Sequence, residues 1–223
     1  MLKINNLNIT LDEMELIKRA DLDIAAGELV LIEGENGSGK SSLIKGIFKY
    51  PGYIISGGNI MLDDKDITTL EVNEMASLGF YFGMQHIPEI EGISTLSFLY
   101  KAYKNLNPDA LSVSDFKNKL VENCKKFDLD VDLLTRDLNV GFSGGQKKQA
   151  DMMHILALQP KYIFLDEPDS GVDKNAVEKV YAVIEHMRSL GSAVVLVSHS
   201  KEVEKLKADK VYEVKENICQ IKS

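Results

Sequence analysis

The chain of 223 residues has no tryptophan and only two cysteines. Cys124 and Cys219 lie far apart and form no Cys-x-x-Cys pattern, which argues against a disulfide and against a metal or cluster site held by one chain. No apolar run approaches about 18 residues, and the amino-terminal segment has no secretory apolar region. We therefore expect no direct membrane insertion and a cytoplasmic location.

Positive charge is also in short supply, with 26 basic against 34 acidic side chains and a formal net charge of −8. An acidic surface disfavours nonspecific binding to nucleic acid and docking on anionic lipid. The sequence has no internal repeat, low-complexity tract or flexible linker. Its composition, 44% hydrophobic and 27% charged, is that of an ordinary globular protein, and we expect one domain over residues 1–223.

Apolar patterns along the chain predict an α/β protein. The first thirty residues alternate apolar and polar positions, which is typical of short antiparallel strands. Continuous apolar runs at 29–32, 162–165 and 193–197 are typical of parallel strands buried on both faces. Helical periodicity over 94–136 predicts an inserted helical subdomain, at about residues 86–140. The predicted fold is a mainly parallel core sheet with an N-terminal antiparallel β subdomain and this insertion.

A glycine-rich loop follows the first of these buried strands and fits the pattern G-x-x-x-x-G-K-[ST]. Glycines let the backbone wrap a phosphate, and the N–H groups at a helix start point at the anion. Lys40 is predicted to reach the β- and γ-phosphates, and the Ser41 hydroxyl to ligate Mg²⁺. The predicted nucleotide-binding residues here are Gly34, Asn36, Gly37, Ser38, Gly39, Lys40, Ser41 and Ser42.

Two carboxylates, Asp166 and Glu167, end the buried strand 162–165, at the sheet edge where ligands of α/β proteins bind. Asp166 is predicted to hold the Mg²⁺ shell, and Glu167 to polarise the attacking water. A solvated acid pair is the alternative reading of Asp-Glu-Pro taken alone. The phosphate loop in the same chain favours the catalytic role for Asp166 and Glu167.

Gln85 and His199 follow two further core strands. The Gln85 amide could reach Mg²⁺ or the lytic water, and His199 could hydrogen-bond the γ-phosphate. Both are therefore predicted to be catalytic, with Gln85 also a metal ligand. His86, His154 and His186 have no such placement and are expected to be structural or surface residues.

The segment Phe142-Ser143-Gly144-Gly145-Gln146 precedes a predicted helix at 148–158 and offers glycines, a hydroxyl and a carboxamide to an anion. Alone it could not hydrolyse anything. Together with the phosphate loop, Gln85, the Asp166-Glu167 strand end and His199, it stands in the order of the ABC-type ATPases, which the chain resembles over nearly its full length.

That resemblance implies a P-loop ABC ATPase core and two subunits that dock head to tail in an ATP-dependent homodimer. Each ATP, with Mg²⁺, would lie between the Lys40 loop of one chain and Ser143, Gly144, Gly145 and Gln146 of the other. Asp173 would lie at the dimer junction. Leu11 stands where many ABC ATPases have an adenine-stacking aromatic residue, so use of GTP stays open.

The flanking residues resemble one branch, SufC, the ATPase of the SUF iron–sulfur cluster assembly system. The similar stretches are Leu134–Lys148, Glu167–Asp173 and Gln85–Ser94. Importer and exporter cassettes usually have Thr-Ser or Thr-Ala in place of Asp169-Ser170. A transporter cassette is the alternative. A DNA-repair or chromosome-type ABC ATPase would need a long coiled coil, and the sequence has no sustained heptads.

The SufC resemblance implies SufB-like or SufB/SufD-like scaffold subunits as partners, on which the cluster would form. The partner surface is expected to centre on 85–104, where the segment after Gln85 enters the helical insertion. The run Phe98-Leu99-Tyr100 with Tyr103 is the predicted anchor, because buried aromatic residues often dominate interfaces. Packing inside the insertion is the alternative role for these four side chains.

Overall fold

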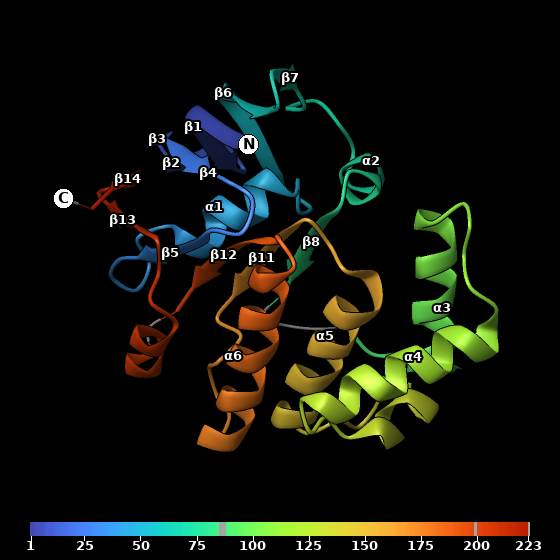
Figure 1. Ribbon diagram of the computed structural model, residues 1–223. Coiled ribbons are helices and arrows are strands. Elements are labelled where there is room, and N and C mark those ends of the chain that lie inside the picture. Colours follow the sequence, from blue (N-terminus) through green and yellow to red (C-terminus); the bar gives the residue numbers. More distant parts are fainter. Residues whose placement is uncertain (85–87, 199, 223) are drawn as a thin grey trace.

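A seven-stranded sheet forms the centre of the molecule in the computed structural model, which describes residues 1–84, 88–198 and 200–222 (Figure 1). Five neighbouring strands are parallel, because apolar runs buried on both faces pair side by side. The strand order is β3 (Arg19–Ala20), β14 (Ile218–Ile221), β13 (Lys210–Lys215), β5 (Leu29–Glu33), β12 (Ala193–Val197), β11 (Tyr162–Asp166) and β8 (Phe80–Gly83).

An antiparallel sheet covers one side of this core. Its central strand β1 (Leu2–Leu11) alternates buried apolar residues with exposed polar ones, as a half-buried strand should. Helix α1 (Lys40–Ile47) contacts strands of both sheets. The other strands of this sheet are β2 (Met14–Ile17), β4 (Leu22–Ile24), β6 (Tyr53–Leu62) and β7 (Lys65–Asp66).

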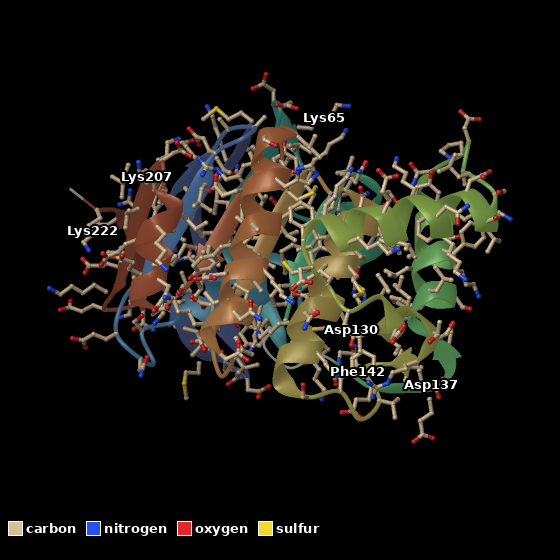
Figure 2. All side chains as sticks on the ribbon, turned by 60° about the horizontal axis from the view of Figure 1, so that its bottom comes forward. Lys65, Asp130, Asp137, Phe142, Lys207 and Lys222 are labelled. Atoms are coloured by element: carbon tan, nitrogen blue, oxygen red, sulfur yellow. The ribbon has the colours of Figure 1, made fainter. Side chains whose placement is uncertain are left out.

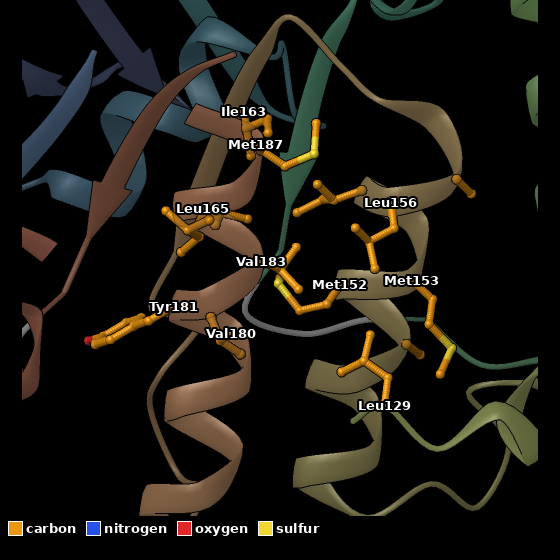
Figure 3. Close-up of a cluster of buried hydrophobic side chains, with 14 of the residues drawn as sticks. Leu129, Met152, Met153, Leu156, Ile163, Leu165, Val180, Tyr181, Val183 and Met187 are labelled. Atoms are coloured by element: carbon orange, nitrogen blue, oxygen red, sulfur yellow. The ribbon is translucent and has the colours of Figure 1, made fainter. Parts of the chain in front are cut away.

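Helices α5 (Gly144–Leu158) and α6 (Lys174–Ser189) cover the opposite face of the core sheet (Figure 1). Met152 and Leu156 of α5 point toward Val183 and Met187 of α6 (Figure 3). Each such side chain contributes roughly 1.5–3 kcal/mol when fully buried. This packing holds α5 on the sheet.

The segment between β8 and α5 is mainly helical and extends to one side of the molecule (Figure 1). The side chains of Ser94 and Ser112 cap its two longer helices. Its elements are β9 (Ile90–Ser94), α3 (Thr95–Leu106), α4 (Val113–Lys126), the 3-10 turn η1 (Val131–Thr135) and β10 (Asp137–Leu138). The remaining helices are α2 (Val72–Ser77), before β8, and the 3-10 helix η2 (Lys201–Leu206).

The predicted α/β class is confirmed, with a mainly parallel core sheet, an N-terminal antiparallel sheet and helices between β8 and α5. The glycine pair at 57–58 predicts a strand that opens there and runs through Met61, and this start is wrong, because β6 begins at Tyr53. Within the described ranges, none of the helices combines the length and apolar character that crossing a bilayer requires.

The aromatic side chains expected to anchor a partner pack within the chain, against the insertion itself and against α5. The rings of Tyr100 and Tyr103 lie 5.4 and 4.8 Å from that of Phe116, and Phe98 lies 5.9 Å from His154. Leu99 is fully buried. The alternative role, internal packing, is therefore what the structure shows for these residues.

Candidate active site

The predicted site residues that can be described gather at the carboxyl ends of adjacent parallel strands. β12 lies between β5 and β11 and pairs with both, so Asp166, Val197 and Ile32 stand side by side across the sheet. The phosphate loop leaves β5 at this edge, and Asp166 ends β11 there. Parallel pairing thus brings together segments that are more than a hundred residues apart in sequence.

The loop at 34–39 needs its glycines for two reasons. Gly34, Gly37 and Gly39 all have positive φ values, of 147°, 81° and 108°. A Cβ at Gly34 would lie 2.4 Å from the Val214 carbonyl oxygen, and one at Gly39 would lie 2.8 Å from Ile17 Cδ1. The loop is therefore held tightly between the antiparallel sheet and β13, in a conformation that other residues would strain.

Lys40 begins α1 and is only 4% exposed. Its ammonium donates hydrogen bonds to the carbonyl oxygens of Gly34 (2.9 Å) and Glu35 (2.7 Å), across the mouth of the loop. Burial lowers the pKa of this lysine, and the negative charges of Glu167 and Asp166 oppose that shift. A desolvated cation is thus aimed at the loop where a phosphate would lie.

Ser41 and Asp166 form the oxygen pair predicted to hold a metal ion. The Ser41 hydroxyl donates to Asp166 Oδ1 at 2.8 Å, and the second carboxylate oxygen is buried with no hydrogen-bond partner among the residues that the structure describes. Burial raises the pKa of Asp166, with Ser41 and Lys45 acting against the shift. A buried carboxylate oxygen of this kind beside a hydroxyl fits a hard cation that prefers oxygen ligands, as Mg²⁺ does. The Ser38 hydroxyl oxygen in the loop is likewise buried and has no partner within the described ranges.

Glu167 adopts the left-handed conformation, with φ of 51°, directly after β11. Its N–H donates to the Val197 carbonyl oxygen (2.9 Å), and its own carbonyl oxygen accepts from Lys148 Nζ (2.9 Å). The residue is therefore fixed by its backbone to β12 on one side and to α5 on the other. No local pattern in the sequence indicates the role of Lys148, whose side chain is buried and whose pKa is lowered by that burial.

Asp169 is a further acid after β11. In the sequence it served only to distinguish a SufC-like chain from transporter cassettes. It is 7% exposed, and its Oδ2 accepts from the hydroxyls of Tyr181 (2.6 Å) and Ser198 (2.5 Å). Ser198 Oγ in turn accepts from the N–H of Ser200 at 3.0 Å. The loop after β11 is thereby joined to the loop after β12, on both sides of position 199.

The glycine-rich segment starts helix α5 with a capping box. Ser143 is the N-cap and accepts from the N–H of Gln146 (3.3 Å), while Gln146 Oε1 accepts from the N–H of Ser143 (3.1 Å). Ser143 and Gly144 are exposed. Within the described residues, no hydrogen bond joins Ser143–Gln146 to the phosphate loop of the same chain. Asp173 caps α6 by accepting from the N–H of Ala176 (2.9 Å).

Asn36 and Ser42 are the other predicted residues of the phosphate loop and α1. Asn36 lies exposed at the tip of the loop, and Ser42 is half-buried in the first turn of α1. Leu11 ends β1 beside Gly52, where a Cβ would lie 2.8 Å from its Cδ1. Gln85 and His199 lie outside the described residues. β8 and β12, the strands before them, end at Gly83 and Val197.

Comparison with known proteins bears directly on this arrangement. The model of the ABC transporter family matches residues 17–170. The chain is 37% identical to a "Probable ABC transporter ATP-binding protein" of Streptococcus pyogenes serotype M3, over 89% of the chain and 78% of the relative. The chain belongs to the ABC transporter ATPase family. As a member, it is an ATPase that binds and hydrolyses ATP.

Two further relatives of this ABC ATPase are nearly as similar. "Vegetative protein 296" of Bacillus subtilis is 36% identical over 89% of the chain and 77% of the relative. A "Probable ATP-dependent transporter" of Synechocystis is 36% identical over 89% of the chain and 79% of the relative. Among solved structures, the ADP- and phosphate-bound cassette MJ0796 superposes with a TM-score of 0.85 at 22% identity, covering 100% of this chain and 98% of that one. This last likeness shows the shared cassette fold.

Proposed function

We propose that this ABC ATPase is a SufC-type subunit that drives conformational change in a SufB-like or SufB/SufD-like scaffold during iron–sulfur cluster assembly. It would act as a single domain over residues 1–223, with its helical insertion at about 86–140. The observation that carries the proposal is Asp169, which stands where importer and exporter cassettes usually have threonine. A buried carboxylate can accept two hydroxyls at once, as Asp169 does from Tyr181 and Ser198.

The roles of the site residues follow from their positions. Lys40 and the loop N–H groups would bind the ATP phosphates, and Ser41 and Asp166 would hold Mg²⁺, which supplies charge neutralisation at the β- and γ-phosphates. Glu167, fixed by its backbone, would orient and polarise the attacking water. Gln85 would sense the metal or the water, and His199 the γ-phosphate.

The segment Ser143-Gly144-Gly145-Gln146 is called the signature from here on. Its glycines support an ATP site shared between two chains. A Cβ on Gly144 would meet nothing closer than the Gly171 carbonyl oxygen at 3.6 Å, and one on Gly145 nothing closer than Ala176 Cβ at 4.0 Å. Neither position has a positive φ. Glycine at both positions is thus unexplained inside one chain, and close approach by a nucleotide held on the Lys40 loop of a second copy explains it. Asp173, near this segment, would meet the same partner.

The two thiols support a cluster that forms on the scaffold. Cys124 and Cys219 are both fully buried, and they belong to separate apolar clusters of the core. Burial raises the pKa of each thiol to about 12. Only thiolates ligate iron well, so these cysteines are poorly suited to hold or hand over a cluster.

A groove between α2, β8 and α3 is the proposed docking site for the scaffold. Its volume is about 850 Å³, and its lining includes the exposed apolar side chains of Tyr50, Val72, Leu78 and Leu106. The charged side chains among its described lining residues are two lysines, Lys49 and Lys161. In a protein with a net charge of −8, this favours an amphipathic helix whose apolar face is bordered by carboxylates.

A transporter cassette is the second candidate, favoured by the names of the relatives in Streptococcus pyogenes and Synechocystis. In that case the groove would receive a cytoplasmic helix of a membrane permease. The two candidates thus share the ATPase chemistry and differ in the partner.

Co-expression separates them. The tagged chain, carrying Glu167→Gln to prolong the ATP-bound state, is co-expressed once with the SufB-like protein of the same genome and once with a permease encoded beside it. A stable complex with the SufB-like chain in the absence of detergent supports the proposal. Binding only to the permease in detergent would overturn it.

A groove variant tells specific docking from nonspecific association. Leu106→Glu removes an apolar contact and adds a charge of the sign expected on the partner, so it should weaken the complex at least tenfold. Leu190→Glu is the matched control, because Leu190 is equally apolar, 57% exposed and outside the groove lining. Equal binding by both variants would show that the scaffold docks elsewhere.

A further inference from the structure

Residues 88–94, here called the strap, are tied to the segment that leads into the signature helix α5. The strap contains β9, which pairs with β10 in a small antiparallel sheet. Three side chains of the 137–147 segment add contacts to it: Asp137 Oδ2 accepts from the Gly92 N–H (2.9 Å), Asn139 Nδ2 donates to the Pro88 carbonyl oxygen (3.0 Å) and Lys147 Nζ donates to Glu89 Oε1 (2.7 Å).

Asn139 is unusual among these because it is buried. It is 1% exposed, holds a left-handed conformation with φ of 60°, and its Oδ1 has no hydrogen-bond partner among the described residues. A buried amide oxygen without a partner is costly for folding. The bond from its Nδ2 to the Pro88 carbonyl oxygen ties the strap to the turn before the signature.

The Lys147–Glu89 pair contributes little to folding stability, because the two side chains are 29% and 46% exposed. The Glu89 carboxylate nevertheless has two donors that hold it in place. The Lys147 ammonium and the Gly141 N–H both bind the Glu89 carboxylate and lower its pKa. Lys147 lies in the first turn of α5, directly after Gln146, so the pair fixes the signature itself to the strap.

A stacked pair stiffens the turn between these contacts. The Arg136 guanidinium lies 4.5 Å from the centre of the Phe142 ring, and Phe142 is 6% exposed. Asp137 and Phe142 lie near each other at one edge of the molecule, away from Lys207 and Lys222 (Figure 2). The 136–147 segment is therefore joined to the strap at several points along its length.

We propose that Glu89, Lys147 and Asn139 are positioning residues that set the orientation of Ser143-Gly144-Gly145-Gln146 toward the nucleotide of a second copy. This inference rests on the shared ATP site of the proposed function. The strap holds the signature helix at a fixed angle, so breaking its contacts weakens the ATP-bound dimer and leaves nucleotide binding by the phosphate loop unchanged.

Charge reversal tests the proposal in the Glu167→Gln chain. We compare Glu89→Lys, Lys147→Glu and the double swap by sedimentation velocity with ATP and Mg²⁺, and we titrate each monomer with a fluorescent ATP analogue. Each single change should weaken dimerisation roughly tenfold, which is within the range that coupled neighbours show. The double swap should restore it to within about twofold. Nucleotide affinity of the monomer should stay the same.

Two further variants complete the test. Glu122→Lys makes the same charge change at an exposed ion pair on α4, with Lys126, and should leave the dimer unaffected. Asn139→Gly removes the bond to Pro88 while tolerating the positive φ, and should weaken the dimer as the single reversals do.

Single reversals that dimerise like the parent chain, or a folded double swap that restores nothing, would overturn the positioning role. If the parent Glu167→Gln chain itself stays monomeric with ATP, the shared site fails, and the positioning role fails with it. The two failures are thus told apart by the parent chain alone.

Discussion

At the scale of single residues, Lys40 is the buried positive charge of the phosphate loop. It is a desolvated cation held by two carbonyl oxygens, with Asp166 and Glu167 as the charges that act on it. Those carbonyls belong to the loop that would bind the phosphates. The ammonium is therefore available to the γ-phosphate at little cost in side-chain entropy, because its position is already fixed.

Lys40→Ala should reduce ATP turnover by about 10²-fold or more, because developing phosphate charge loses its nearest cation. Steady-state phosphate release measures this directly. Lys3→Ala, at an exposed position of β1, is the matched control and should hydrolyse ATP like the unchanged chain. Turnover by Lys40→Ala at the rate of the control would remove the assignment of the phosphate loop.

At the scale of elements, helix α5 belongs to both the site and the core, because it begins with the signature and packs against α6. It is buried nearly all round, and three polar residues at a spacing of three, Lys148, Asp151 and His154, lie buried on it. The Tyr81 hydroxyl donates to Asp151. Within the described ranges, the buried Nε2 of His154 has no hydrogen-bond partner. Folding shifts the pKa of all three groups, and those of Asp151 and His154 move within the range between about pH 4 and pH 6.5.

These two groups act in opposite directions as pH falls. Burial lowers the pKa of His154 to about 4 from 6.5, so between those values the unfolded chain binds the extra proton and acid destabilises the fold. Burial raises the pKa of Asp151 to about 6 from 3.8, with Tyr81 and Lys148 opposing, so over that range the folded chain binds the extra proton.

Replacing His154 by leucine should therefore change how stability depends on pH. Relative to the unchanged chain, His154→Leu should gain about 2 kcal/mol in free energy of unfolding between pH 7.5 and pH 4.5, since the histidine no longer favours the unfolded state in acid. Urea unfolding at the two pH values measures this. Asp151→Asn should lose stability relative to the unchanged chain over the same fall in pH, because the folded state no longer gains from binding that proton. A His154→Leu curve parallel to the parent at both pH values would contradict the buried neutral histidine.

The elements also show how far the sequence alone could lead. The continuous apolar runs predict which segments form the parallel strands. They therefore also predict which loops lie together at the carboxyl edge of the sheet. That is why Ser41 and Asp166, far apart in sequence, could be predicted to lie together. The helix predicted at 148–158 starts earlier, at Gly144, because the capping box of Ser143 and Gln146 takes the signature into its first turn.

Tertiary contacts without local periodicity could not be predicted. The two-residue strand β10 is too short to show an alternating pattern, so its pairing with β9 was missed. The hydrogen bonds of Asp169 to Tyr181 and Ser198 depend on three separate elements. The aromatic residues of α3 show the same limit, because a helical stripe of apolar side chains does not reveal whether Phe116 or a partner covers it.

At the scale of the whole molecule, charge opposes self-association. Each chain carries a formal net charge of −8, and bound ATP adds more negative charge at the proposed junction. Two copies therefore repel at long range and need specific contacts to stay together. The exposed start of α5 and the phosphate loop would supply these contacts only when a nucleotide bridges them.

Glu167→Gln should accumulate ATP-dependent dimers, because the amide keeps the shape of the side chain but cannot take a proton from water. Repulsion should make these dimers weaker at about 10 mM salt, where charges act over about 30 Å, than at about 100 mM, where they act over about 10 Å. Sedimentation velocity at both salt concentrations, with and without ATP, measures this. Lys40→Ala in the same chain is the control and should stay monomeric. Monomers alone at both salt concentrations would contradict a site completed by a second copy, and dimers without ATP would contradict a nucleotide bridge.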